Sequence, residues 1–171
     1  ILDLACGAGR HTRALCKWQW TVGFDLSAAL LDVAHQISPD EPYVRGDMRA
    51  LPFADGTFGL VVNLFTSFGY FDTDDQQLLV LAEVARVVAA GGTFVLDYLN
   101  SEQVRGTLVP WDEAMTNGRM VHQRRSISPD NRYVEKTITA DGLQGSYVER
   151  VRLFTPSELR RMLAACGFKV T

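Results

Sequence analysis

The sequence has no excess of positive charge and few cysteines. It carries 17 Lys and Arg against 20 Asp and Glu, for a formal net charge of -3 over 171 residues. A nucleic-acid-binding surface normally shows as a basic excess, so we expect no nucleic-acid partner. Cys6, Cys16 and Cys166 are odd in number and lack metal-ligand spacing. They predict reduced thiols, a cytoplasmic setting and no metal site.

Long hydrophobic runs are also absent. The longest, from Leu78 to Ala90, is interrupted by Glu83 and Arg86, so we expect no membrane span. The chain opens at Ile1 inside a strand-like pattern and without an initiator Met. We therefore expect no signal peptide, and a piece of a longer chain from which N- and C-terminal parts are missing.

Strand and helix patterns alternate through the first hundred residues. Short apolar runs predict strands at residues 1–4, 21–24, 43–45, 58–65 and 93–98. Helices are predicted at 10–18, after Ser27 with Leu30, Leu31 and Ala34 on one face, and from Thr73 to the Gly91-Gly92 pair. This alternation predicts an α/β fold with three layers, in which a mostly parallel sheet has helices on both faces.

The pattern changes after Asn100. Residues 119–128, 132–140 and 146–154 alternate loosely and are separated by turn residues, which predicts an antiparallel β insertion at 101–154. We expect this insertion after the fifth strand of a single domain that spans residues 1–171. A capping box at Thr155–Glu158 then predicts a helix that ends at Gly167, followed by a sixth strand at 168–171.

A glycine loop follows the first strand. Gly7 and Gly9 allow close approach of a ligand, but Thr12 stands at the third glycine position of the dinucleotide fingerprint. Alone, this loop is weak evidence for a ligand, because a tight turn that binds nothing would look similar. Asp25 ends the second strand, where a carboxylate can accept both hydroxyls of a ribose. Asp47 ends the third strand, and its carboxylate can accept an adenine amino group beside an apolar Met48. Together these three strand ends predict a nucleotide-like ligand at the carboxyl edge of the sheet.

These motifs resemble a known family. Residues 1–11 (ILDLACGAGRH) are similar to motif I of class I S-adenosylmethionine-dependent methyltransferases of the small-molecule type. Residues 22–27, 46–48, 51–58 and 81–96 resemble the family's later motifs, and the similarity resumes at 155–171. The resemblance implies a Rossmann-like methyltransferase fold, S-adenosylmethionine as the cofactor, and methyl transfer by in-line displacement to a small-molecule acceptor.

The resemblance also implies which residues bind the cofactor. Those around its methionine part are Asp3, Ala5, Cys6, Gly7 and Gly9. Asp25 would hold the ribose, whereas Leu26, Asp47 and Met48 would hold the adenine. Those beside the transferable methyl group are Asn63, Leu64 and Phe65. Ala5 departs from the glycine that many members have, Gly59 replaces a usual Asp, and Ala90 replaces a common Pro.

Several questions stay open at this stage. No catalytic base stands out, although Tyr70, Tyr98 and His122 are candidates for polar groups near the acceptor. Sequence gives neither the acceptor nor whether oxygen, nitrogen or carbon is methylated. We expect the insertion to wall the acceptor site or to form a homodimer contact. An NAD-dependent oxidoreductase and a non-catalytic module that binds S-adenosylmethionine are the alternatives.

Overall fold

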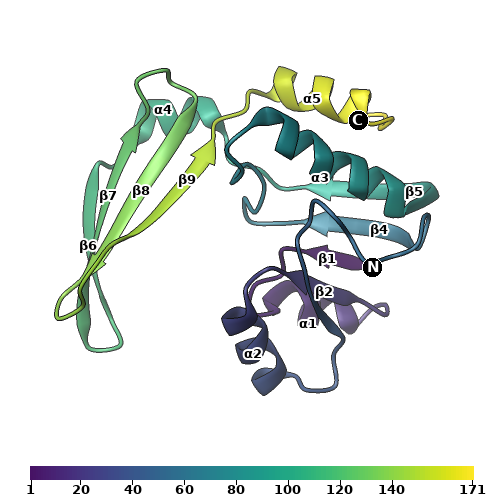
Figure 1. Cartoon of the computed structure of the whole chain (residues 1–171), viewed down its shortest axis with the longest axis horizontal. Coiled ribbons are helices and arrows are strands. Elements are labelled where there is room, and N and C mark those ends of the chain that lie inside the picture. Colours follow the sequence, from purple (N-terminus) through teal and green to yellow (C-terminus); the bar gives the residue numbers. More distant parts are fainter. The chain divides into compact units, whose positions relative to one another are not determined.

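The chain forms a parallel five-stranded sheet and an antiparallel four-stranded sheet (Figure 1). The computed structural model describes residues 1–171, which divide into two compact units. Unit 1 comprises Ile1–Phe68, Asp72–Tyr98 and Arg160–Thr171. Unit 2 comprises Gly69–Phe71 and Leu99–Leu159, and the expected insertion at 101–154 lies within it.

The parallel sheet belongs to unit 1 and confirms the predicted α/β class. Its strands are β1 (Leu2–Leu4), β2 (Val22–Asp25), β3 (Tyr43–Arg45), β4 (Phe58–Asn63) and β5 (Val88–Leu96). They follow the order β3-β2-β1-β4-β5, and every neighbouring pair is parallel. All three residues of β1 are buried, as expected for the central strand of a covered sheet. The carboxyl ends of the strands therefore meet at one edge.

Three helices follow strands of the parallel sheet, and side chains cap the start of the second and the third. The three that follow strands in unit 1 are α1 (Arg10–Cys16), α2 (Ala28–Ile37) and α3 (Asp74–Val87). Ser27 accepts a hydrogen bond from the Leu30 amide, and Thr73 forms the predicted capping box with Gln76. The helix α2 packs against β2 and β3, whereas α3 packs against β5 (Figure 1). The last helix, α5 (Pro156–Ala165), starts in unit 2 and continues into unit 1.

One arginine on α3 holds the segment that leads into β4. The Arg86 guanidinium donates to the carbonyl oxygens of Leu51 and Phe53 and to the Asp55 carboxylate, at 2.7 to 2.9 Å. Glu83 accepts from the Leu51 amide and from Arg86. The stretch at 51–58, which resembles a methyltransferase motif, is therefore held to α3 through its own main-chain atoms.

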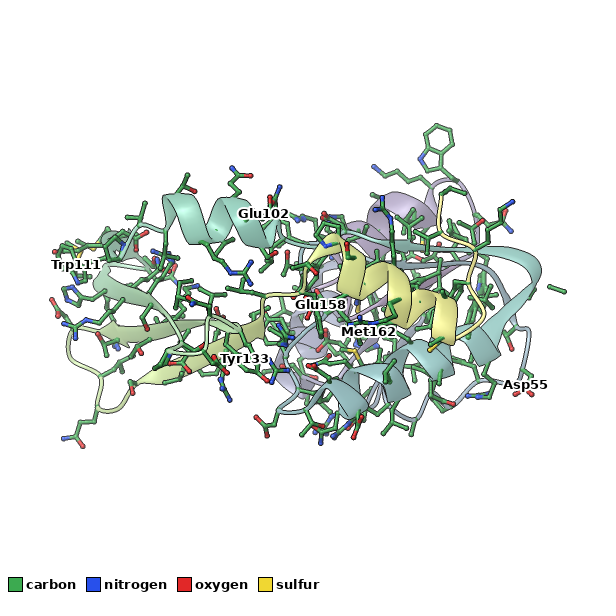
Figure 2. All side chains as sticks on the ribbon, turned by 90° about the horizontal axis from the view of Figure 1, so that it is seen from above. Asp55, Glu102, Trp111, Tyr133, Glu158 and Met162 are labelled. Atoms are coloured by element: carbon green, nitrogen blue, oxygen red, sulfur yellow. The ribbon has the colours of Figure 1, made fainter.

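Unit 2 is built around the antiparallel sheet. It contains α4 (Ser101–Thr107), β6 (Trp111–Thr116), β7 (Arg119–Ile127), β8 (Tyr133–Ala140) and β9 (Tyr147–Arg152). The strands follow the order β6-β7-β8-β9, which confirms the predicted antiparallel segments and adds α4 and β6. In Figure 2, Trp111 and Tyr133 lie at different ends of this unit.

The prediction that α3 would end at Gly91-Gly92 was wrong. The helix ends at Val87, and β5 starts at once at Val88, which pairs with Phe58. Consecutive β-branched valines favour a strand over a helix end. Gly91, at a φ of 76°, lies where the register between β4 and β5 is irregular, so it serves a bulge.

Three further details differ from the predictions. Residues 168–171 follow the Gly167 helix end but form no strand, because no strand pairs with them. The fourth strand ends at Asn63 because Phe65 adopts a φ of 61°, which strands exclude. Leu30 is 44% exposed and does not share the buried face of Leu31 and Ala34.

Two glycines in different strands of the parallel sheet, Gly23 in β2 and Gly59 in β4, allow a matched test of packing. A Cβ on Gly23 would lie 2.6 Å from the Tyr43 ring and 2.9 Å from the Thr12 hydroxyl, whereas a Cβ on Gly59 would meet nothing within 4 Å. Gly23→Ala should therefore lower the free energy of unfolding by about 1–3 kcal/mol. Gly59→Ala should leave it unchanged or raise it by up to about 1 kcal/mol. Urea denaturation measures both, and equal destabilisation would contradict this packing.

Candidate cofactor site

The glycine loop between β1 and α1 is shaped by left-handed backbone. Ala5, Gly7 and Gly9 have φ values of 60°, 55° and 74°. The Cys6 amide donates to the Phe24 carbonyl oxygen and the Gly9 amide to the Cys6 carbonyl oxygen, each at 3.0 Å. Because these two amides already have partners within the protein, they are not free to donate to a ligand. The loop contributes mainly a surface that a ligand can approach closely. Ala5 takes the left-handed conformation that glycine adopts more easily.

Asp25 joins this loop to the start of α2. Its carboxylate accepts the Gly7 amide on Oδ2 and the Ser27 amide on Oδ1, both at 2.8 Å. A carboxylate can accept about four hydrogen bonds, so each oxygen retains capacity for a ligand. The side chain lies at the strand end where the sequence predicts ribose binding, and it is partly exposed.

Asp3 lies in β1 beneath the loop, and its side chain is buried. The Thr12 hydroxyl donates to its Oδ2 at 2.6 Å. Burial raises the pKa of Asp3, a change that the Thr12 hydrogen bond opposes. Thr12, at the third glycine position of the dinucleotide fingerprint, is thus the partner of Asp3. Its hydroxyl also fills the space beside Gly23, so close packing here depends on Gly23 rather than on a third loop glycine.

Cys6 is not a reactive thiol. Burial raises the pKa of its thiol to about 12, with the nearby carboxyls of Asp3 and Asp25 adding to the effect. A thiol with such a pKa stays protonated at neutral pH and is a poor nucleophile. Cys6 therefore contributes packing to the loop.

Asp47 follows β3 and is paired with Arg49. The Arg49 guanidinium donates to both carboxylate oxygens, with Nη2 2.6 Å from Oδ2, and the Arg49 amide donates to Oδ1. These hydrogen bonds lower the pKa of Asp47. Arg49 was not among the predicted site residues, although it lies only two positions after Asp47. It fixes the carboxylate that would meet an adenine amino group, while Met48 is half-buried beside it and Leu26 is 62% exposed.

Asn63 ends β4 next to the end of β1. Its Nδ2 donates to the Leu4 carbonyl oxygen at 2.9 Å. Its Oδ1 is buried and accepts no hydrogen bond. Buried acceptors are normally satisfied, so this oxygen fits a ligand that brings a donor. Leu64 is half-buried after it, and Phe65 is 75% exposed.

The three acceptor candidates are divided between the two units, with Tyr98 in unit 1 and Tyr70 and His122 in unit 2. Tyr98, in unit 1, packs edge-on against Phe68 with ring centroids 6.2 Å apart. His122, in unit 2, contacts Asp141 at 3.0 Å and Glu113 at 3.9 Å and stacks on Trp111. These contacts are those of a residue that holds a sheet together.

Tyr70 lies in the short segment of unit 2 between β4 and α3. Burial raises the pKa of its phenol, and the Glu149 carboxylate and Tyr147 add to the effect. At neutral pH the hydroxyl therefore stays protonated and is available as a hydrogen-bond donor rather than as a base.

The structure contains neither a metal site nor a membrane-spanning helix. His, Cys, Asp and Glu side chains do not gather in groups of three or more that could bind a metal ion. None of the helices combines the length and the apolar character that crossing a bilayer requires. The three cysteines are unpaired.

The parts of the site lie on successive strand ends of unit 1. The glycine loop, Asp25, Asp47 and the orphaned Asn63 Oδ1 lie at the carboxyl ends of β1, β2, β3 and β4, the edge where open α/β sheets bind ligands. These oxygens are hydrogen-bond acceptors and suit a ligand that brings ribose hydroxyls, an adenine amino group and an ammonium group as donors, so these residues fit S-adenosylmethionine.

Comparison with known proteins agrees with this geometry. The family model for the methyltransferase domain matches residues 1–92. The dTDP-3-amino-3,4,6-trideoxy-alpha-D-glucopyranose N,N-dimethyltransferase of Streptomyces venezuelae is 30% identical over 180 residues, which cover 99% of this chain and 75% of that protein.

Solved structures extend the likeness to the fold. Streptomyces venezuelae DesVI is 27% identical with a TM-score of 0.78, covering 99% of this chain and 75% of that one. CalS10, an amino pentose methyltransferase from Micromonospora echinaspora solved with S-adenosylmethionine bound, is 26% identical with a TM-score of 0.74, covering 97% and 73%. These findings favour neither an oxidoreductase nor a non-catalytic module. The chain belongs to the S-adenosylmethionine-dependent methyltransferases, and it transfers the methyl group of that cofactor to a small-molecule acceptor.

Proposed function

We propose that the strand ends of unit 1 bind S-adenosylmethionine residue by residue as the sequence predicts. The residues assigned to the methionine part are Asp3, Ala5, Cys6, Gly7 and Gly9. Asp25 binds the ribose hydroxyls with the capacity left after its two backbone hydrogen bonds. Asp47, held by Arg49, accepts the adenine amino group, with Met48 and Leu26 along the ring.

Asn63, Leu64 and Phe65 border the transferable methyl group in this proposal. Bound S-adenosylmethionine would supply a methyl group on a positively charged sulfur: the acceptor's lone pair forms a bond to the methyl carbon as the carbon–sulfur bond breaks in line, and S-adenosylhomocysteine leaves. The protein's task is to align the acceptor and exclude water, and alignment alone can lower a barrier by roughly 7–11 kcal/mol. The orphaned Asn63 Oδ1 supports its place here, since it can accept from a donor of the bound cofactor.

We further propose that the acceptor is an amino group on a small sugar, so that the enzyme is an N-methyltransferase. The observation that carries this proposal is the extent of similarity to the Streptomyces venezuelae amino-sugar N,N-dimethyltransferase. It covers 99% of this chain and therefore includes the antiparallel sheet as well as the cofactor domain. An amine must be neutral to attack, and its proton can leave to solvent, so a dedicated base is not required.

We propose that Tyr70, in the segment that follows β4, helps to bind the acceptor. The chain leaves β4 at Asn63 and enters unit 2 at Gly69, whose carbonyl oxygen accepts the Arg152 amide of β9 at 2.8 Å. This hydrogen bond ties the segment Gly69–Phe71 to the antiparallel sheet. Tyr70, as a protonated donor in this segment, can hydrogen-bond a hydroxyl group of the acceptor sugar.

We also propose that the enzyme works in a reducing cytoplasm. The unpaired state of Cys6, Cys16 and Cys166 supports this proposal.

We propose further that the enzyme forms a homodimer through unit 2. Exposed apolar side chains on this unit, among them Met115, Tyr147 and Val148, support the dimer. Sedimentation equilibrium should give twice the chain's 19.0 kDa, and a monomer at micromolar concentration would reject the dimer.

Replacing Asp25 tests the cofactor site. Asp25→Ala should weaken S-adenosylmethionine binding by about 1–3 kcal/mol, because the ribose hydroxyls lose an acceptor and the Gly7 amide loses its anchor. Isothermal titration calorimetry measures the affinity. Asp32→Ala removes an exposed carboxylate from α2 and should leave it unchanged. An unaltered affinity in Asp25→Ala would mean that the ribose is held elsewhere.

A matched pair of acceptors tests the amine proposal. The enzyme is given nucleotide-linked sugars that differ only in an amino or a hydroxyl group at one ring carbon, and release of S-adenosylhomocysteine is followed. We expect turnover of the amine alone, with kcat/KM rising as pH increases until the ammonium has lost its proton. Methylation of the hydroxyl sugar at an equal rate would reject the assignment to nitrogen.

A further inference from the structure

The turn after β4 is held in a strained backbone conformation. Phe65 and Thr66 follow one another with φ values of 61° and 56°. Neither is glycine, and Thr is β-branched, so the left-handed region is costly for both. Such strain persists only where surrounding contacts impose it, and it concentrates at functional sites.

Asp97 supplies the contacts that impose it. Its Oδ2 accepts the Phe65 amide at 3.0 Å, and its carbonyl oxygen accepts the Thr66 amide at 3.2 Å. Its own amide donates to the Asn63 carbonyl oxygen at 2.9 Å. Asp97 directly follows β5, whose last residue, Leu96, is in register with Asn63. One residue therefore binds the turn at its start and at both strained positions.

The turn so held reaches towards the glycine loop. The Phe65 ring is 75% exposed to solvent, and the Arg10 guanidinium lies over it, 5.1 Å from the ring centroid. Arg10 is the first residue of α1 and directly follows Gly9. Contacts thus run from Asp97 after β5, through Phe65 after β4, to Arg10 beside the loop that is assigned to the methionine part of the cofactor.

We propose that Asp97 is a positioning residue for the methionine part of S-adenosylmethionine. It acts by fixing the Phe65–Thr66 turn as a wall of the site, and it does so as a hydrogen-bond acceptor rather than through its negative charge. This inference rests on the proposed cofactor site. It also gives a role to the end of β5, to which none of the cofactor motifs belongs.

Two ligands and three variants test the proposal. S-adenosylmethionine contains the methionine part, whereas adenosine retains the adenine and the ribose but lacks the sulfur, its methyl group and the amino-acid end. The variants of the whole chain are Asp97→Ala, Asp97→Asn and, as a control on exposed β5 surface, Thr93→Ala. Dissociation constants are measured by isothermal titration calorimetry.

Asp97→Ala should weaken S-adenosylmethionine binding about tenfold or more, because the strained turn loses its anchor, and should leave adenosine binding unchanged. Asp97→Asn retains an acceptor oxygen and should bind both ligands as the wild type does, as should Thr93→Ala. Equal weakening of both ligands in Asp97→Ala would overturn the proposal in favour of a general structural role.

Two other results are informative. An Asp97→Asn variant as weak as Asp97→Ala would overturn it in favour of a direct charge contact with the ligand. Failure of the wild-type chain to bind either ligand would instead reject the proposed cofactor site, so the two failures can be told apart.

Discussion

The candidate site depends on one carboxylate that accepts two backbone amides. Asp25 binds the Gly7 amide of the glycine loop and the Ser27 amide at the start of α2, each at 2.8 Å. Charge-assisted hydrogen bonds of this length are among the stronger ones in proteins. They lock the loop to β2, and the same oxygens keep the capacity to accept further hydrogen bonds, on which the proposed ribose contact rests. If that proposal holds, loss of this side chain would disturb both the loop and the binding of the cofactor.

Close packing beneath this carboxylate distinguishes the site from a dinucleotide fold. A Cβ on Gly9 would lie 2.4 Å from the Tyr43 hydroxyl, and Gly23 is equally crowded by Tyr43 and Thr12. The helix α1 approaches the sheet over Gly23, so the third fingerprint position is free to hold Thr12. Its hydroxyl binds the buried carboxylate of Asp3 at 2.6 Å. The close packing that the third fingerprint glycine would allow is therefore provided by Gly23, and Thr12 can stand at that glycine's position.

Local signals made much of the fold predictable. Ser27, Thr73 and Thr155 cap helices as their sequences predict, since a cap depends only on neighbours within three residues. Asp25 was predictable because it ends an apolar strand, and Asp47 because it follows the next strand, although that strand ends two residues earlier, at Arg45. Arg49 and Asp97 were not, since their roles come from hydrogen bonds to Asp47 and to the turn at Phe65 that only the folded backbone brings about. The start of β5 was missed because pairing of Val88 with Phe58 decides it.

Hydrogen–deuterium exchange with and without S-adenosylmethionine tests the central claim, that the carboxyl edge of the parallel sheet is the cofactor site. We expect the cofactor to slow exchange in peptides covering residues 3–10, 22–27, 44–49 and 63–66, while NAD at the same concentration leaves them unchanged. Protection confined to residues 111–152 of the antiparallel sheet, with none at the glycine loop, would contradict the account.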